Sequence, residues 1–129
     1  MTTILNLNSK TLKDFFNEFT LENGFSSVLL TDSTGFPIIH SSDDINDAET
    51  TAAIVSKIQQ AISQVKDLLD MNILEEVTML DNNGKRLVIR SFVTNSSTMF
   101  MVFIIPNRTI PYKRTMKKIL QTITTEWAI

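Results

Sequence analysis

The sequence predicts an α/β (α+β) fold, a three-layer α/β/α sandwich built on a five-stranded antiparallel sheet. Turn-forming residues separate short apolar runs at residues 32–35 and 81–84, which is typical of β-hairpins. Three longer segments repeat apolar residues at helical spacing. The run 99–105 is apolar without alternation, which indicates a central strand with helices on both sides of the sheet. Together these segments give the order α-β-β-α-β-β-β-α.

Composition narrows the class of protein. The 129 residues are expected to form a single domain spanning 1–129, and an apolar content of 43% is typical of a globular chain. A net charge of −2 gives no general attraction to nucleic acid, and the absence of cysteine excludes disulfides and thiolate chemistry. Residues 1–24 show no secretory signal, and no apolar run approaches the ~20 residues of a membrane helix. We therefore expect a cytoplasmic protein without a membrane span.

The first helix is expected to begin at Ser9 and end at Gly24, because serine suits an N-cap and glycine a C-cap. A hairpin should follow, pairing residues 28–30 with 36–39 across the turn 32–35. The apolar side of the helix is formed by Leu12, Phe15, Phe16 and Phe19.

Three acidic residues, Asp43, Asp44 and Asp47, are expected to start a long second helix, because carboxylates suit the positive end of the helix dipole. This helix should end near residues 70–72. Its apolar residues fill an arc of roughly 140°, wider than the ~100° needed to pack on one surface. We therefore expect it to cover the sheet and to contact something else as well. The apolar set is Ile54, Val55, Ile58, Ala61, Ile62, Val65, Leu68 and Leu69.

The second half of the chain predicts three strands, Ile73–Leu80, Arg86–Val93 and Met99–Ile105, and then a last helix. The turn 81–84 joins the first two strands through an Asn-Gly pair. Pro111 fits the first turn of the last helix. The buried side of that helix is expected to hold Tyr112, Met116, Ile119, Leu120, Ile123 and Trp127.

Motifs for catalysis or cofactor binding are not evident. The sequence contains no G-x-x-x-x-G-K-[ST] and no G-x-G-x-x-G, so no phosphate-binding loop is predicted. His40 is the only histidine and has no neighbours at ligand spacing. The turn 81–84 begins like a calcium loop, but Arg90 stands where the bidentate glutamate is required. We expect a protein that is not an enzyme and binds no cofactor, metal or small-molecule ligand.

Basic residues cluster on and before the last helix. Lys113 and Lys117 and, less closely, Arg114 and Lys118 share a flank opposite its apolar side. Two interpretations are open: a solvated helix surface, or a docking patch for an acidic partner or a membrane headgroup surface. The four residues are Lys113, Arg114, Lys117 and Lys118.

The hairpin D-S-T-G-F-P-I at residues 32–38, the long second helix, the D-N-N-G turn and the apolar fifth strand resemble the roadblock/dynein light chain family. The resemblance covers about residues 9–128. It implies a domain without catalytic machinery that regulates or scaffolds a Ras-like small GTPase, or that tethers dynein light chains.

Similar proteins dimerise by pairing the third strand with its symmetry mate and placing the two long helices side by side. The resemblance therefore implies a homodimer, and the wide apolar arc of the second helix supports it independently. The implied interface residues are Ile54, Ile58, Ala61, Ile62, Val65, Leu68, Ile73, Val77 and Met79.

Three functions follow as hypotheses. The first is a homodimeric module that docks a Ras-like small GTPase. The second is a light-chain-like structural adaptor that binds a peptide or helix of a larger complex. The third is a ligand-sensing domain, for which the predicted core supplies few convergent polar groups.

Overall fold

The computed structural model describes residues 9–41, 45–94 and 97–126 and contains the predicted five-stranded antiparallel sheet. The strand order is β2-β1-β5-β4-β3, so the apolar fifth strand lies at the centre, as predicted. The order of the elements also agrees with the prediction. The elements are α1 (Ser9–Asn23), β1 (Ser27–Asp32), β2 (Pro37–His40), α2 (Ile45–Leu68), β3 (Glu76–Leu80), β4 (Arg86–Thr94), β5 (Ser97–Ile105) and α3 (Lys113–Glu126).

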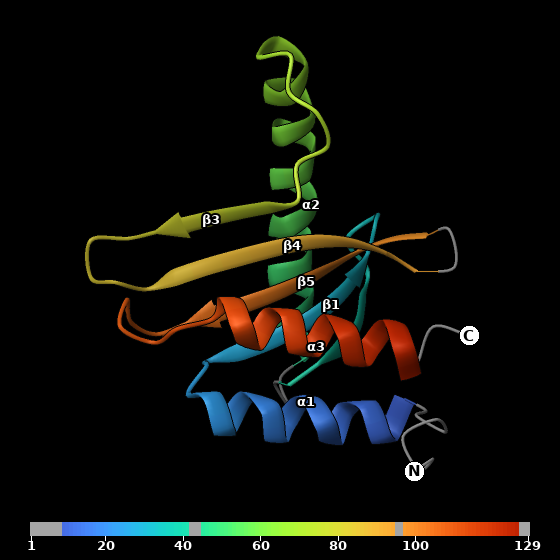
Figure 1. The fold of residues 1–129 in the computed structure, drawn as a ribbon, viewed down its shortest axis with the longest axis vertical. Coiled ribbons are helices and arrows are strands. Elements are labelled where there is room, and N and C mark those ends of the chain that lie inside the picture. The colour runs from blue at the N-terminus through green and yellow to red at the C-terminus, as the bar shows by residue number, and fades with distance from the viewer. Residues whose placement is uncertain (1–8, 42–44, 95–96, 127–129) are drawn as a thin grey trace.

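The sheet is the middle of three layers, with α1 and α3 on one face and α2 on the other (Figure 1). Successive residues of β5 alternate between the two layers. Met101 and Phe103 pack among the α1 and α3 side chains, whereas Phe100 and Val102 pack against α2. Both faces of β5 are therefore buried, which explains why its sequence shows no polar alternation.

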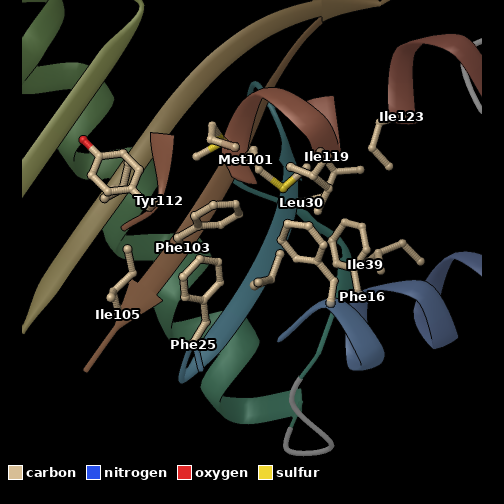
Figure 2. Close-up of a cluster of buried hydrophobic side chains, with 14 of the residues drawn as sticks. Phe16, Phe25, Leu30, Ile39, Met101, Phe103, Ile105, Tyr112, Ile119 and Ile123 are labelled. Atoms are coloured by element: carbon tan, nitrogen blue, oxygen red, sulfur yellow. The ribbon is translucent and has the colours of Figure 1, made fainter. Parts of the chain in front are cut away.

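The larger core lies between the sheet and the α1/α3 layer (Figure 2). Aromatic rings form its centre: the Phe25 and Phe103 rings lie 4.7 Å apart, and Phe19 contacts both. Ile119 and Ile123 of α3 reach the same core, so α1 and α3 are neighbours in one layer.

The β1–β2 turn is held by the carboxylate of Asp32. Its Oδ1 accepts hydrogen bonds from the Thr34 amide at 2.9 Å, the Thr34 hydroxyl at 2.7 Å and the Phe36 amide at 3.0 Å. Partial desolvation raises the pKa of Asp32, but these hydrogen bonds outweigh it and leave the pKa below its ordinary value. Gly35 has φ +90°, and a Cβ there would lie 2.7 Å from the Cβ of Ser56 on α2. The turn is therefore fixed both internally and against α2.

Helices α1 and α2 end with the same hydrogen-bond motif but with different residues in the left-handed position. After α1, Gly24 has φ +72°, and the amide of the next residue bonds to the Thr20 carbonyl. After α2, Asp70 has φ +55°, and the Met71 amide bonds to the Lys66 carbonyl. Both ends match the Schellman pattern, in which glycine is favoured because it has no Cβ.

Replacing Asp70 with glycine is therefore expected to raise the free energy of unfolding by about 1 kcal/mol, because the left-handed conformation is strained for a residue with a Cβ. Urea denaturation measures this change. Asp67→Gly is the control: Asp67 lies inside α2, where glycine should destabilise by about 0.5–1 kcal/mol. If both variants changed the free energy of unfolding in the same direction, the proposed backbone strain at Asp70 would be contradicted.

Several predicted boundaries were wrong. Strand β3 begins at Glu76 instead of Ile73, because the chain first has to return from the end of α2 to the sheet edge. Helix α2 ends at Leu68, and α3 begins at Lys113, so that Pro111 lies before the helix. Asp43, Asp44 and Trp127 lie outside the described residues. Within the described ranges, no helix has the length and apolar character needed to cross a membrane.

Candidate interaction surface

Every residue of the implied interface has an accessible side chain in this structure. Helix α2 contributes three buried residues to its core, Ala48, Ala52 and Val55, and from Ile58 to Leu68 no side chain is fully buried. Val77 and Met79 pair with Ile89 and Leu87, which pack on the α2 side of the sheet. The exposed members are Ile54, Ala61, Val65, Leu68, Ile73 and Met79, and the half-buried members are Ile58, Ile62 and Val77.

An apolar groove of about 330 Å³ runs along one flank of α2. Its wall on the helix is formed by Thr51 and Ile54. Its floor comes from three neighbouring strands and includes Met79 of β3, Leu87 of β4 and Ile104 of β5. The groove brings together two predicted interface residues, Ile54 and Met79, which are far apart in the sequence.

The other flank of α2 is polar. There a shallow hollow of about 540 Å³ separates the helix from the β1–β2 turn. The helix contributes Glu49, Ser56, Lys57 and Gln60 to it, and Phe36 of the turn lies at its side. Ala53 is the apolar residue that α2 contributes to this hollow, so the large apolar side chains of α2 lie mainly on the flank that faces the groove.

The two edges of the sheet also differ. At the β2 edge Pro37 has no amide to donate, and the Lys13 ammonium donates a hydrogen bond to the His40 carbonyl at 2.9 Å. Proline and lysine are typical means of blocking an edge strand. Strand β3 is the other edge, contains no proline or lysine, and exposes Met79 and Leu80. Among the residues that the structure describes, no proline or lysine blocks this edge, which is therefore open to pairing with another strand.

The C-terminal part of α2 projects beyond the open edge (Figure 1). Before that end, Ile62 and Lys66 line a hollow with Ile73 of the returning segment and Phe100 of β5. Leu68, at the end of the helix, is 84% exposed, and Ile73 in the returning segment is 81% exposed. The projecting end is therefore apolar and uncovered.

The four basic residues predicted as a docking patch are all exposed on α3. Because α3 and α2 lie on opposite faces of the sheet, the structure does not bring these residues near the groove. Their role as a docking site stays a prediction.

A polar cluster at the start of α3 was not predicted. The Tyr112 hydroxyl donates to the Glu76 carboxylate at 2.7 Å, and the Arg86 guanidinium lies 5.2 Å from the centre of the Tyr112 ring. Arg86 also donates to the carbonyls of Asn107 and Ile110. Burial raises the pKa of Tyr112, and the hydrogen bond to Glu76 adds to that rise although the Thr78 hydroxyl opposes it. The sequence signal was the pair of polar residues Glu76 and Thr78 on one face of the predicted third strand.

The described part of the chain holds no group of three or more His, Cys, Asp or Glu side chains placed to bind a metal ion. The D-N-N-G segment is a turn, as predicted: the Asp81 carboxylate accepts hydrogen bonds from the amides of Asn83 and Lys85.

The strand order and the placement of the helices define a roadblock-like α/β/α sandwich. The chain belongs to the Roadblock/LC7 domain family, whose model matches residues 11–93. Comparison with curated protein sequences gives no match.

Solved structures share the fold at low sequence identity. MglB from Myxococcus xanthus superposes with a TM-score of 0.67 at 16% identity, over 89% of this chain and 84% of that chain. The gliding protein MglB from Thermus thermophilus gives 0.67 at 17% identity, over 93% and 87%. A Roadblock/LC7 domain from Streptomyces avermitilis gives 0.66 at 11% identity, over 86% and 90%.

Proposed function

We propose that this protein is a non-catalytic homodimeric regulator or scaffold that binds a Ras-like small GTPase in the cytoplasm. Membership of the Roadblock/LC7 family supports the proposal, because the resemblance implies GTPase regulation or scaffolding. The observation that carries the homodimer is the apolar surface that continues from the groove flank of α2 to the open β3 edge.

The shape of one copy suits a second copy related by a two-fold axis through the β3 edge. Antiparallel pairing of β3 with its symmetry mate extends the sheet and keeps both α2 helices on the same face. Residues Ile62–Leu68 span about 10 Å along a helix, or about two strand spacings. The projecting end of one α2 then crosses β3 and β4 of the other copy, the strands that supply most of the groove floor.

The open β3 edge favours one alternative, the light-chain-like adaptor. An extended peptide can add to an exposed edge strand through main-chain hydrogen bonds. In that case the edge would be occupied by a segment of a larger complex instead of a second copy.

A capture experiment distinguishes the two functions. The purified protein is immobilised, and small GTPases from its source cell are loaded with GDP or with a non-hydrolysable GTP analogue. A GTPase regulator or scaffold is expected to retain one GTPase in one nucleotide state preferentially, since switch regions change order with the γ-phosphate. No retention in either state, together with binding of an extended peptide that competes with dimer formation, would contradict the GTPase proposal and support the adaptor.

A further inference from the structure

We propose that the outer surface of α3 is a second docking surface, and that it binds an acidic segment of another protein. We call this surface the basic face, defined by Lys113, Arg114, Lys117 and Lys118. It lies on the opposite side of the sheet from the groove and the α2 flank, so it stays accessible when those surfaces are covered.

The geometry of α3 presents the four cations together. Met116, Ile119 and Ile123 are buried against the sheet. At about 100° per residue, Arg114, Lys117 and Lys118 project from the opposite side of the helix and Lys113 from the adjoining flank, and all four are exposed. None forms an ion pair with another residue that the structure describes. From Lys113 to Thr125 the helix contains no carboxylate that could neutralise them.

The arrangement is unfavourable for α3 itself. Lys113 and Lys117, and likewise Arg114 and Lys118, are like charges four residues apart, which repel on a helix surface. Lys113 and Arg114 also lie in the first turn of the helix, where the helix dipole opposes positive charge. Glutamate at either of these two positions would suit α3 better. A surface whose charges destabilise its own helix is expected where those charges act on something outside the chain.

The basic face is held in place before any partner arrives. Tyr112, directly before α3, is tied to the β3 edge through Glu76, and Arg86 holds the loop before the helix through the Asn107 and Ile110 carbonyls. A preformed surface loses less conformational entropy on binding, which favours affinity.

The neighbouring helix decides which anionic partner fits. Helix α1 lies beside α3 in the same layer and exposes three carboxylates on its outer side, Asp14, Glu18 and Glu22. A flat anionic bilayer or a nucleic-acid duplex is wider than one helix, about 10–12 Å across, and would meet these carboxylates as well. A narrow acidic protein segment lying along α3 meets only cations. Charge complementarity therefore favours an acidic helix or peptide.

Binding of an acidic segment to the basic face is measured by fluorescence anisotropy with a labelled, glutamate-rich helical peptide. The measurement is made at about 0.15 M salt, where exposed charges are screened beyond ~8 Å. Reversing two charges, Lys113→Glu with Lys117→Glu, is expected to weaken peptide binding about tenfold, since each exposed pair contributes modestly. The control variant, Lys57→Glu with Lys85→Glu, makes the same change in net charge on the α2 side of the chain. Because Lys85 lines the groove, sedimentation is used to confirm that this variant keeps the oligomeric state of the parent. It is expected to bind the peptide like the parent.

Equal loss of binding in the reversed and control variants would overturn the proposal, because the peptide would then sense net charge alone. Tighter binding of phosphatidylserine vesicles or duplex DNA than of the peptide, lost on reversal, would also overturn it. So would a change in sedimentation of the protein alone on reversal, because the basic face would then bind another copy. If the reversed variant fails to fold, Lys113→Gln with Lys117→Gln takes its place, with a smaller loss of binding expected.

Discussion

Replacing Leu68 with lysine is expected to convert a homodimer into monomers while leaving the fold intact. Leu68 is 84% exposed within one copy, so little packing is lost there, and lysine suits the C-terminal end of a helix. In a two-fold pair the substitution counts twice. Burying one leucine side chain in the interface stabilises the dimer by about 2 kcal/mol. Losing two of them therefore weakens dimer formation by about 4 kcal/mol, which raises the dissociation constant roughly a thousandfold. Sedimentation velocity at micromolar concentration measures this change.

Leu21→Lys is the matched control for Leu68→Lys. Leu21 is 82% exposed and lies on α1, on the other face of the sheet. The Leu21 variant should sediment as the parent does. A parent chain that is monomeric at this concentration would contradict the homodimer. A dimer that survives Leu68→Lys would instead show that the α2 end lies outside the interface.

Replacing Gly35 with alanine is expected to lower the free energy of unfolding by about 3 kcal/mol, the largest of the stability changes predicted for this protein. Two costs add at this position. A side chain at φ +90° is strained by about 1–2 kcal/mol. The new methyl would also lie 2.7 Å from the Cβ of Ser56 and 2.9 Å from the Ala52 carbonyl oxygen, and a contact with helix backbone cannot relax cheaply.

Gly24→Ala separates the two costs, since Gly24 also has a positive φ. Its added Cβ would be 3.6 Å from the nearest atom, which is an ordinary contact. The Gly24→Ala variant is therefore expected to lower the free energy of unfolding by only about 1 kcal/mol. Urea denaturation of both variants measures the difference between them. Equal decreases in the free energy of unfolding would mean that the close approach of the turn to α2 adds nothing to the cost of Gly35→Ala.

The sequence predicted the layers of the fold because their signals are local. Helical spacing, two glycine turns and one uninterrupted apolar run are each read within about ten residues. The position of β5 at the centre of the sheet followed from burial on both of its faces. The wide apolar arc of α2 likewise predicted a surface left over after packing, and Val65 and Leu68 are indeed uncovered in one copy.

Features that join distant segments could not be predicted in this way. The groove combines Ile54 with Leu87 and Ile104, which only the strand order brings together. The pairing of Tyr112 with Glu76 crosses 36 positions of sequence.

The buried side of α2 was predicted only in part, through Val55, and for a different reason. It consists largely of alanines, Ala48 and Ala52, whose small side chains stand out less than the isoleucines on the exposed flank. The β1–β2 turn also comes close to the helix backbone here, since a Cβ at Gly35 would lie 2.9 Å from the Ala52 carbonyl oxygen. A pattern based on large apolar residues therefore identified the exposed flank of the helix in preference to the buried one.

The unequal edges of the sheet bear on how many copies can join. A sheet with two open edges can add strands at both ends and grow into a fibre without limit. Here β2 is blocked by Pro37 and Lys13, and β3 alone is open. When β3 of one copy pairs with β3 of another, both open edges are used and both outer edges are blocked ones. Growth through the sheet is therefore self-terminating at two copies, a stoichiometry set by one proline and one lysine far from the pairing strand.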